Sequence, residues 1–370
     1  MWPRSHGNRL PFFATMTAMT GIGPRRRPTI TDVATAAGVA ASTVSRAFTR
    51  PGRVNADTRE HVLSVAAELG YYPNPVARAL ESGRTNTLAL VVPDIANPFF
   101  AGLIKGAESV ASASGQVLVL VDSQESATVE EHLIRRLEPS VDGFVLAASR
   151  LRAERLAEFA ASTSFVLVNG VARGIASVLA DYDDGTRQIV AHLSANGHES
   201  LLFLAGPVGS WSGARRWRGL QHAGARVGMT TRRFGPHPPT LAAGLKAATA
   251  AIDSGATAVV CHNDLLAIGV LRGLLARGVA VPGEVSVVGF DNTVSSELCS
   301  PTLTTLAEPS ADAGAQAVLT LRKIAYERVA QPPTILLATK LMLRDSTGPA
   351  RLDGAARGTG RSPVPQPGAR

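Results

Sequence analysis

Residues 29–47 read TITDVATAAGVAASTVSRA, and this stretch decides the fold of the N-terminal part of the chain. Two short helical patterns flank Gly38, which can supply a left-handed turn between them. Thr31 or Asp32 is expected to cap the first helix, and Val44 falls on the apolar side of the second. The arrangement predicts a helix-turn-helix, because its two helices can pack through small residues and leave one side of the second helix outside.

A third helix is expected from about Ala56 to Leu69, beginning after Asn55 as its cap and ending at Gly70. Its apolar residues recur at helical spacing: Val62, Val65, Ala66 and Leu69. This stripe would close a three-helix core, which predicts a compact headpiece over residues 28–72.

The outer side of the second helix carries three residues that could read bases: Ala41, Ser42 and Arg46. Arg46 is the strongest candidate, because an arginine can bind guanine O6 and N7 with two hydrogen bonds in the major groove. Other polar side chains offer contacts to phosphates: Thr29, Thr31, Thr43, Ser45, Asn55 and Tyr71. Each of these has an ordinary cap or a surface hydroxyl as its alternative role.

Residues 74–85 read NPVARALESGRT and predict a short helix that begins after Asn74 and ends at Gly83. About eight residues are too few for a stable isolated helix in water. We therefore expect it to fold on a partner, with Leu80 beside the small Ala77 as a wedge for a minor-groove step. The alternative is a plain linker helix.

In order and spacing, these segments resemble the lactose/galactose repressor (LacI-type) family. The resemblance consists of T-I-x-D-V-A-x-x-A-G-V…T-V-S-R at 29–46, Tyr71, and N-P-V-A-R-A-L at 74–80, and it runs from about residue 28 to residue 345. It implies an N-terminal three-helix helix-turn-helix headpiece plus hinge helix, followed by an α/β two-lobed periplasmic-binding-protein-like core of type I.

The family resemblance also implies roles for individual residues. The three outer residues of the second helix would read bases, and Leu80 would intercalate at the centre of a palindromic operator. Ala40 stands where the family commonly has a serine that binds phosphate. Thr49 and Arg50 replace a customary asparagine, so a backbone contact there is expected from Arg50.

Short apolar runs alternate with helical patterns between residues 86 and 345, as is typical of parallel strands in α/β units. The expected strands are Thr87–Val92, Val117–Asp122, Gly143–Ala147, Phe165–Asn169, Leu201–Ala205, Ala258–Cys261 and Ser286–Phe290. This number of strands fits two similar lobes with a cleft between them.

Ligands of open parallel sheets bind at the carboxyl ends of the strands, which makes the residues after each run the effector-binding candidates. They are Asn97, Phe99, Asp122, Asn169, Ser212, Arg216, Asn263 and Asp291. By resemblance, Phe99 would stack on the ligand, Arg216 would hold polar oxygens and Asp291 would accept from hydroxyls. This chemistry favours a sugar or a nucleoside. The alternatives are a helix cap for Asp291 and a surface arginine for Arg216.

Composition and charge narrow the function further. Residues 1–85 carry 11 Arg and 5 acidic residues, whereas residues 86–345 carry 22 basic and 23 acidic ones. A basic leading segment on a neutral body is typical of a polyanion-binding module joined to a separate domain. The sequence shows no apolar run of about 18 residues, and its two cysteines favour a reducing cytoplasm over a disulfide framework or a zinc site.

The ends of the chain are expected to be disordered: a basic arm at 1–27 and a tail at 346–370, with the hinge and linker at 73–85. An apolar stretch at 10–14 could be read as part of a signal peptide, but a proline interrupts it and no A-x-A site follows. Met1, Met16 or Met19 could each be the start.

Three classes of function remain to be compared. A dimeric, ligand-responsive transcription repressor uses every segment, with Phe99–Val110 and Leu266–Leu275 as apolar helices for the homodimer. A solute-binding protein of the same core fold would need no residues 28–82. An enzyme would need a phosphate loop, a nucleophile elbow or an HExxH pair, and the sequence contains none of these. We therefore expect no cofactor, no metal and no membrane partner.

Overall fold

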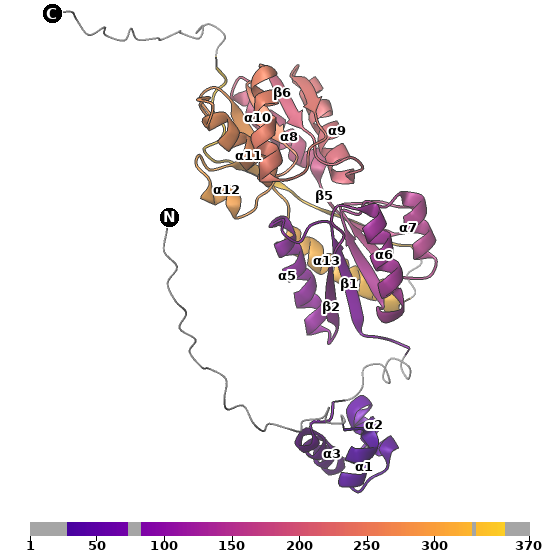
Figure 1. Cartoon of the computed structure of the whole chain (residues 1–370). Helices are drawn as coiled ribbons and strands as arrows, with labels where there is room; N and C mark the ends of the chain where they lie inside the picture. Colours follow the sequence, from indigo (N-terminus) through magenta and orange to yellow (C-terminus); the bar gives the residue numbers. More distant parts are fainter. Residues whose placement is uncertain (1–27, 73–82, 328–330, 352–370) are drawn as a thin grey trace, which may run out of the picture. The chain divides into compact units, whose positions relative to one another are not determined.

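The computed structural model describes residues 28–72, 83–327 and 331–351, which fall into two compact units, one ending at Gly83 and one beginning at Arg84 (Figure 1). The expected hinge residues Asn74, Ala77 and Leu80 lie outside the described residues, as do the arm at 1–27 and the chain from 352 onward.

The first unit is a three-helix headpiece. Its elements are α1 (Ile30–Ala36), α2 (Ala41–Thr49), the 3-10 helix η1 (Pro51–Arg53) and α3 (Ala56–Leu69). Val33, Val44 and Val62, one from each α-helix, are fully buried at its centre. The helix-turn-helix and the bounds of the third helix are as predicted, but Leu69 is 40% exposed and does not belong to the core.

The caps of the headpiece differ in part from those expected. Thr29 caps α1, and Asp32 completes a capping box by accepting from the Thr29 backbone N–H at 2.7 Å. The expectation of Thr31 or Asp32 as the cap was therefore wrong by position, because Thr29 is the residue with extended backbone before the first turn. Ala40 occupies the cap position before α2 and makes no capping hydrogen bond, because its side chain is a methyl group. Asn55 caps α3 as predicted.

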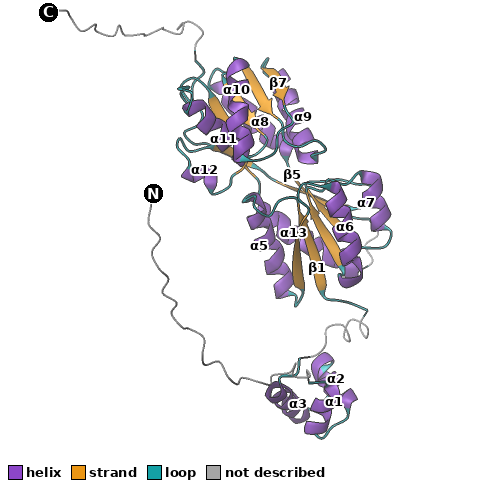
Figure 2. Cartoon of the chain, viewed as in Figure 1, coloured by secondary structure: helices purple, strands orange, loops and turns teal. Residues whose placement is uncertain are grey.

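The second unit consists of two α/β lobes with helices on both faces of each sheet (Figure 2). The first lobe holds a parallel sheet in the order β11-β5-β4-β3-β1-β2. Its strands are β1 (Thr87–Val92), β2 (Val117–Asp122), β3 (Gly143–Ala147), β4 (Phe165–Val168), β5 (Ala176–Ala180) and β11 (Thr334–Leu337). Its helices are α5 (Phe99–Ala113), α6 (Ala127–Leu137), η2 (Glu138–Ser140), α7 (Ala153–Ala160) and α13 (Ser310–Tyr326).

The second lobe repeats this plan in the order β12-β10-β9-β8-β6-β7, and β12 pairs antiparallel to β10. Its strands are β6 (Ser200–Leu204), β7 (Thr230–Phe234), β8 (Ala258–Cys261), β9 (Ser286–Asp291), β10 (Thr304–Ala307) and β12 (Lys340–Met342). Its helices are α8 (Tyr182–Ala195), α9 (Trp211–Arg226), α10 (Leu241–Asp253), α11 (Asp264–Leu275) and α12 (Ser295–Leu298).

The chain crosses between the lobes three times: between β5 and α8, between β10 and α13, and between β11 and β12. Hydrogen bonds tie two of these crossings together, because the Asp181 N–H donates to the Leu337 carbonyl at 2.8 Å and the Thr339 hydroxyl donates to the Asp181 carbonyl at 3.0 Å. The crossings lie at the carboxyl ends of β5 and β10. The strand ends of both lobes therefore face one region, where a ligand of such a fold binds.

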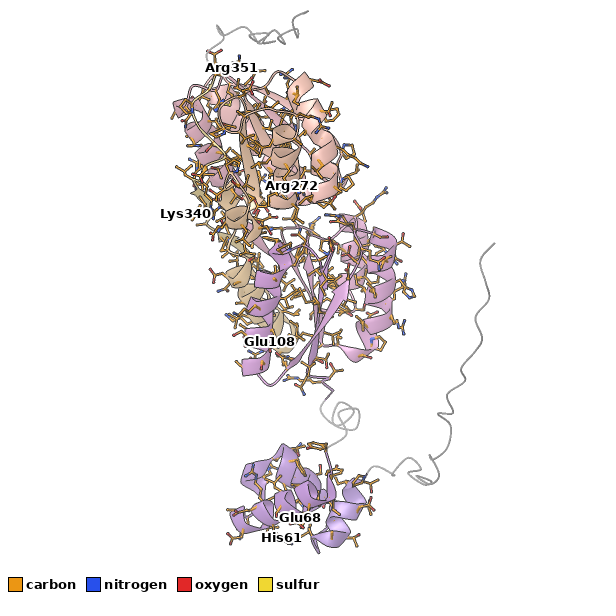
Figure 3. All side chains as sticks on the ribbon, turned by 60° about the vertical axis from the view of Figure 1, so that its left-hand side comes forward. His61, Glu68, Glu108, Arg272, Lys340 and Arg351 are labelled. Carbon is orange, nitrogen blue, oxygen red and sulfur yellow. The ribbon has the colours of Figure 1, made fainter. Side chains whose placement is uncertain are left out.

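The last described residues, 346–351, were expected to belong to a disordered tail but pack on the second lobe. Ser346 is fully buried: its hydroxyl donates to the Val287 carbonyl at 2.6 Å and accepts from the Thr304 N–H at 2.8 Å. The described chain continues to Arg351, at the end of the second lobe remote from Lys340 (Figure 3). The expected tail boundary at 346 was wrong, because residues 346–351 satisfy backbone groups at the ends of β9 and β10.

The two helices proposed for dimerisation use most of their apolar residues inside the chain. Leu103 and Ala107 of α5 are fully buried beneath α13, and Gly106 and Gly314 let the two helix backbones approach so closely that a Cβ at either position would overlap the partner backbone. Most apolar residues of α11 are buried in the second lobe, whereas Leu265 is half-buried and Leu275 is 41% exposed. No helix in the described part of the chain has the length and apolar content that crossing a bilayer requires.

Candidate DNA-binding surface and inter-lobe site

The second helix of the headpiece has two different sides. Val44 and Ala47 are buried in the core, whereas Ala41, Ser42 and Arg46 are exposed. These three exposed residues are the ones expected to read bases. The helix therefore presents a small, uncrowded surface with one long cationic side chain, which suits entry into a major groove.

Arg46 lies along the outside of its own helix. Its Nε donates to the Ser42 carbonyl at 3.0 Å, and one terminal nitrogen lies 3.4 Å from the Ser42 hydroxyl and 3.5 Å from that of Thr43. The contacts are exposed and weak, so the guanidinium can exchange them for an acceptor on DNA at little cost.

The remaining predicted DNA contacts are distributed over the headpiece. Thr31 and Arg50 are exposed, and Ser45 is half-buried on α2. Thr29 and Asn55 serve as helix caps, so their side-chain oxygens already accept from backbone N–H groups. Tyr71 lies edge-on against Phe48, with ring centroids 5.9 Å apart.

Strained backbone marks the strand ends of the second unit. Non-glycine residues with positive φ follow or end four strands, β2, β3, β4 and β9: they are Gln124, Glu125, Ala148, Asn169, Asp291 and Asn292. Such conformations cost on the order of 1–3 kcal/mol each and cluster at ligand sites. Their position agrees with the region at which the crossings of the chain converge.

A buried polar cluster occupies that region, and we call it the Arg216 cluster: Asn169, Tyr182, Arg216, Asp291 and Glu308. The Arg216 guanidinium donates to Glu308, to the Tyr182 hydroxyl at 3.1 Å and to Asp291 at 3.4 Å. The second Glu308 oxygen accepts from Tyr182 at 2.9 Å and from the Asn169 amide at 3.1 Å. Asn169 follows β4 in the first lobe and Arg216 lies on α9 in the second, so the cluster links the lobes.

Charge is unevenly balanced in the Arg216 cluster, because two carboxyl groups share one guanidinium. Burial lowers the pKa of Arg216, but Tyr182, Glu308 and Asp291 outweigh it and raise the pKa above its ordinary value. Burial, together with repulsion by Glu308 and Asp264, raises the pKa of Asp291 well above its usual range despite Arg216. The protonated form of Asp291 is therefore favoured.

Three of the eight predicted effector-binding residues meet in this cluster: Asn169, Arg216 and Asp291. The structure does not bring the other five into it. Ser212 is buried beside Ser210, with 3.2 Å between their hydroxyls. Asn263 caps α11 and donates to the Pro239 carbonyl at 3.2 Å.

The predicted residues of the first lobe also serve local structure. The Asn97 side chain accepts from the Phe99 N–H at 3.1 Å, and Phe99 packs on Phe100 with centroids 5.1 Å apart. The Asp122 carboxylate accepts from the Ile95 and Gln124 N–H groups at 3.2 and 2.8 Å. These contacts shape the loops after β1 and β2.

A pocket of about 390 Å³ opens between the lobes beside the Arg216 cluster. Its lining includes Leu151 and Val171 of the first lobe, Val208 of the loop before α9, and Trp211, the first residue of α9. Gly170 follows Asn169 directly and lines the pocket, although none of the eight predicted residues does so among the described lining residues. The volume lies within the range of small-molecule sites.

Sequence reasoning missed three residues of the site: Tyr182, His262 and Glu308. Tyr182 and Glu308 each follow a strand that the hydrophobic pattern did not reveal, β5 and β10. His262 follows the predicted strand β8, so its position after that strand was an available signal. Its ring lies behind Gly206, where a Cβ would overlap it.

His262 supplies a pH-dependent test of the site. Burial, with Arg216 and Arg150 nearby, lowers the pKa of His262 well below 6.5. The folded chain then binds fewer protons than the unfolded chain, so the stability contributed by neutral His262 is complete above about pH 6.5 and is lost as the pH falls, by up to about 1.4 kcal/mol per pH unit. His262→Gln should flatten this loss, measured as free energy of unfolding in urea between pH 7.5 and 5.

The matched control for that experiment is His222→Gln, because His222 of α9 is exposed. Burial raises the pKa of Asp264 to about 6. Its effect on stability is opposite to that of His262, because the folded chain gains stability as the pH falls and Asp264 takes up a proton. Asp264 is present in all variants and cancels in the comparison. A slope in His262→Gln as steep as in the unaltered chain would contradict the assignment.

Comparisons with known proteins find matches to both the headpiece and the two-lobed core. Residues 29–74 match the model for bacterial regulatory proteins of the lacI family, and residues 190–347 match that for a periplasmic binding protein-like domain. Catabolite control protein A of Priestia megaterium is 31% identical over 330 residues, which cover 86% of this chain and 99% of the relative.

Two solved structures cover both units. The lac repressor dimer bound to operator and the anti-inducer ONPF matches with a TM-score of 0.79 and 26% identity, covering 87% of this chain and all of the other. The transcriptional regulator CelR in complex with cellobiose matches with a TM-score of 0.64 and 30% identity, covering 86% and 100%. These matches include the headpiece, for which a solute-binding protein would have no use.

Relatives named as HTH-type transcriptional regulators or repressors, such as DegA of Bacillus subtilis and CytR of Escherichia coli, are 31% identical and match over 96–99% of their own length. The chain therefore belongs to the lacI family of bacterial regulatory proteins, and it is a DNA-binding transcription regulator rather than an enzyme.

Proposed function

We propose that the chain represses sugar-utilisation genes by binding an inverted-repeat operator as a homodimer. A small polyhydroxyl effector, bound between the lobes, would alter its affinity for that operator. The observation that carries the proposal is the exposed face of α2, with Arg46 on a well-packed helix whose opposite side is buried. An arginine in this position reads guanine in the major groove.

Dimerisation follows from the length of DNA to be read, since two helix-turn-helix units contact half-sites about one helical turn apart. The lac repressor structure is a dimer on its operator, which supports the same assembly here. On α5 and α11 little apolar surface remains after folding. The exposed Leu275, Val294 and Leu298 at the end of α11 and around α12 are therefore candidate contacts with a second copy.

The effector class follows from buried polar groups in and around the Arg216 cluster. The Arg216 Nε and the His262 Nδ1 are buried and have no hydrogen-bond partner among the described residues, and the buried Asp291 accepts a long hydrogen bond of 3.4 Å from Arg216. A hydroxyl group both donates and accepts, so a sugar satisfies all three kinds of group. CelR was solved with cellobiose, which supports this class. Cys261 and Cys299 are free, consistent with action in the cytoplasm.

An operator selection tests the proposal. Purified full-length chain is incubated with random duplexes at a stated salt concentration, and the recovered sequences are measured again with a panel of monosaccharides, disaccharides and nucleosides. We expect an inverted repeat and a change in its affinity with at least one sugar. Recovery of no sequence preferred over scrambled duplex would refute the operator, and indifference to every sugar would refute the effector class.

A further inference from the structure

Helix α13 joins two polar networks of the second unit. It follows the β10 crossing, but it packs in the first lobe against α5 (Figure 1). Its 17 residues correspond to a length of about 25 Å at the usual rise of an α-helix. Glu308 of the Arg216 cluster lies two residues before its first residue, and Tyr326 is its last residue.

The leading end of α13 is held by the Arg216 cluster. Glu308 is 7% exposed and accepts from Arg216, Tyr182 and Asn169. Pro309 separates Glu308 from the helix and restricts the backbone between them. A change in the partners of Glu308 therefore acts directly on the start of the helix.

The far end of α13 holds the chain where it enters the core. The Tyr326 hydroxyl donates to one Asp142 oxygen at 2.7 Å and accepts from the Gln116 amide at 2.6 Å. The other Asp142 oxygen accepts from the Thr85 N–H at 2.7 Å and the Thr85 hydroxyl at 2.9 Å. The Arg84 guanidinium lies over the Tyr326 ring, 4.3 Å from its centroid. Arg84 and Thr85 are the first residues of the core after the expected hinge, and we call this set of contacts the entry clamp.

Between its ends α13 is suited to move as one body. It is an uninterrupted α-helix, and Gly314 seats its backbone against Leu103 of α5 without an intervening side chain. Ala317, Val318 and Leu321 are buried against the sheet of the first lobe. Close-packed interfaces of this kind shift between discrete arrangements instead of deforming smoothly.

We propose that α13 couples the Arg216 cluster to the entry clamp, with Glu308 as the sensing residue and Tyr326 and Asp142 as positioning residues for the segment that leads to the headpiece. This coupling rests on the proposed effector site. A ligand hydroxyl that bonds to Arg216 or Asp291 changes the bonds left for Glu308, and that difference in bonding is what shifts the helix. The clamp then sets where the chain leaves the core toward DNA.

The test needs neither effector nor operator. Hydrogen–deuterium exchange of the full chain is followed by mass spectrometry in two peptides: residues 176–182, where the Ala180 N–H donates to Asn169, and residues 84–88, which contain the clamped Thr85 N–H. Glu308→Gln should raise exchange in both peptides, by about threefold or more. Tyr326→Phe should raise it in residues 84–88.

The combination of variants distinguishes coupling from two separate structural roles. Because the clamp transmits the effect, Glu308→Gln should add nothing in residues 84–88 once Tyr326→Phe is present. Glu297→Gln, a carboxylate of α12 whose side chain is 63% exposed, is the matched control and should alter neither peptide. Tyr182→Phe removes one bond to Glu308 and replaces Glu308→Gln if that variant does not fold.

Two results would overturn the coupling: exchange in residues 84–88 that stays unchanged in Glu308→Gln, or effects of the two variants that multiply independently. Either leaves the operator selection unaffected. Conversely, failure of that selection would remove the proposed function while the exchange result stood.

Discussion

Arg46→Ala should weaken binding to the selected inverted repeat by about 1–3 kcal/mol, and binding to scrambled duplex far less. The exposed guanidinium is held by weak contacts to Ser42 and Thr43 of its own helix, and it can exchange these for two bonds to a guanine. The difference between the two duplexes isolates base reading from attraction to phosphate. Fluorescence anisotropy at one fixed salt concentration measures both affinities.

Arg50→Ala provides the matched control, because Arg50 is also exposed but follows the last residue of α2. If Arg50 contacts phosphate, its removal weakens both duplexes alike and reduces the salt dependence of binding. Equal losses on both duplexes in Arg46→Ala would show that Arg46 also contacts phosphate alone. Neither substitution touches the buried core of the headpiece.

The headpiece was predictable because its signals are local. Gly38 has the positive φ expected at the turn, Asn55 caps α3, and Gly70 ends it in the left-handed conformation. The errors there are also local. Thr29 lies one residue before the first helical residue, and a cap in that position differs from one at Thr31 only in backbone conformation.

Strands were predictable where a buried apolar run is continuous. All seven expected strands are present, with ends within one residue of those expected. The missed strands β5, β7, β10, β11 and β12 have three to five residues each, and β7 is largely exposed at the edge of its sheet. Such strands depend on pairing with strands far away in the sequence, so their own hydrophobic pattern is a weak signal.

The residues of the candidate site were predictable where they follow a predicted strand and were missed where they follow a missed strand. Asn169 and Asp291 lie at the carboxyl ends of predicted strands, so their position in the sequence was enough to make both of them site candidates. Glu308 follows β10, a strand that was not predicted. The carboxylate that accepts a hydrogen bond from Arg216 was therefore not predicted either. The family resemblance assigned Arg216 to effector oxygens, and no ion-pair partner was predicted for it. The structure instead shows a guanidinium already engaged by two carboxyl groups.

These two ion pairs determine what the removal of Arg216 should do. Arg216→Ala should lower the free energy of unfolding of the core by about 3–5 kcal/mol, because it leaves Glu308 and Asp291 buried beside each other without a counter-charge. Urea denaturation at pH 7.5, followed by circular dichroism, measures the loss. Such a variant would lose operator binding through partial unfolding, so on its own it says little about the effector.

A charge-matched pair of substitutions separates the two effects. Arg216→Met with Glu308→Gln removes one charge of each sign and keeps the volume of both side chains, so it should recover most of the stability lost in Arg216→Ala. Arg187→Ala is the control, since Arg187 and Asp184 form an exposed pair on α8 that contributes little. If Arg216→Ala is as stable as Arg187→Ala, the cluster does not hold the lobes together as the contacts indicate. If the double variant folds, still binds the inverted repeat and ignores every sugar, Arg216 and Glu308 act in effector sensing itself.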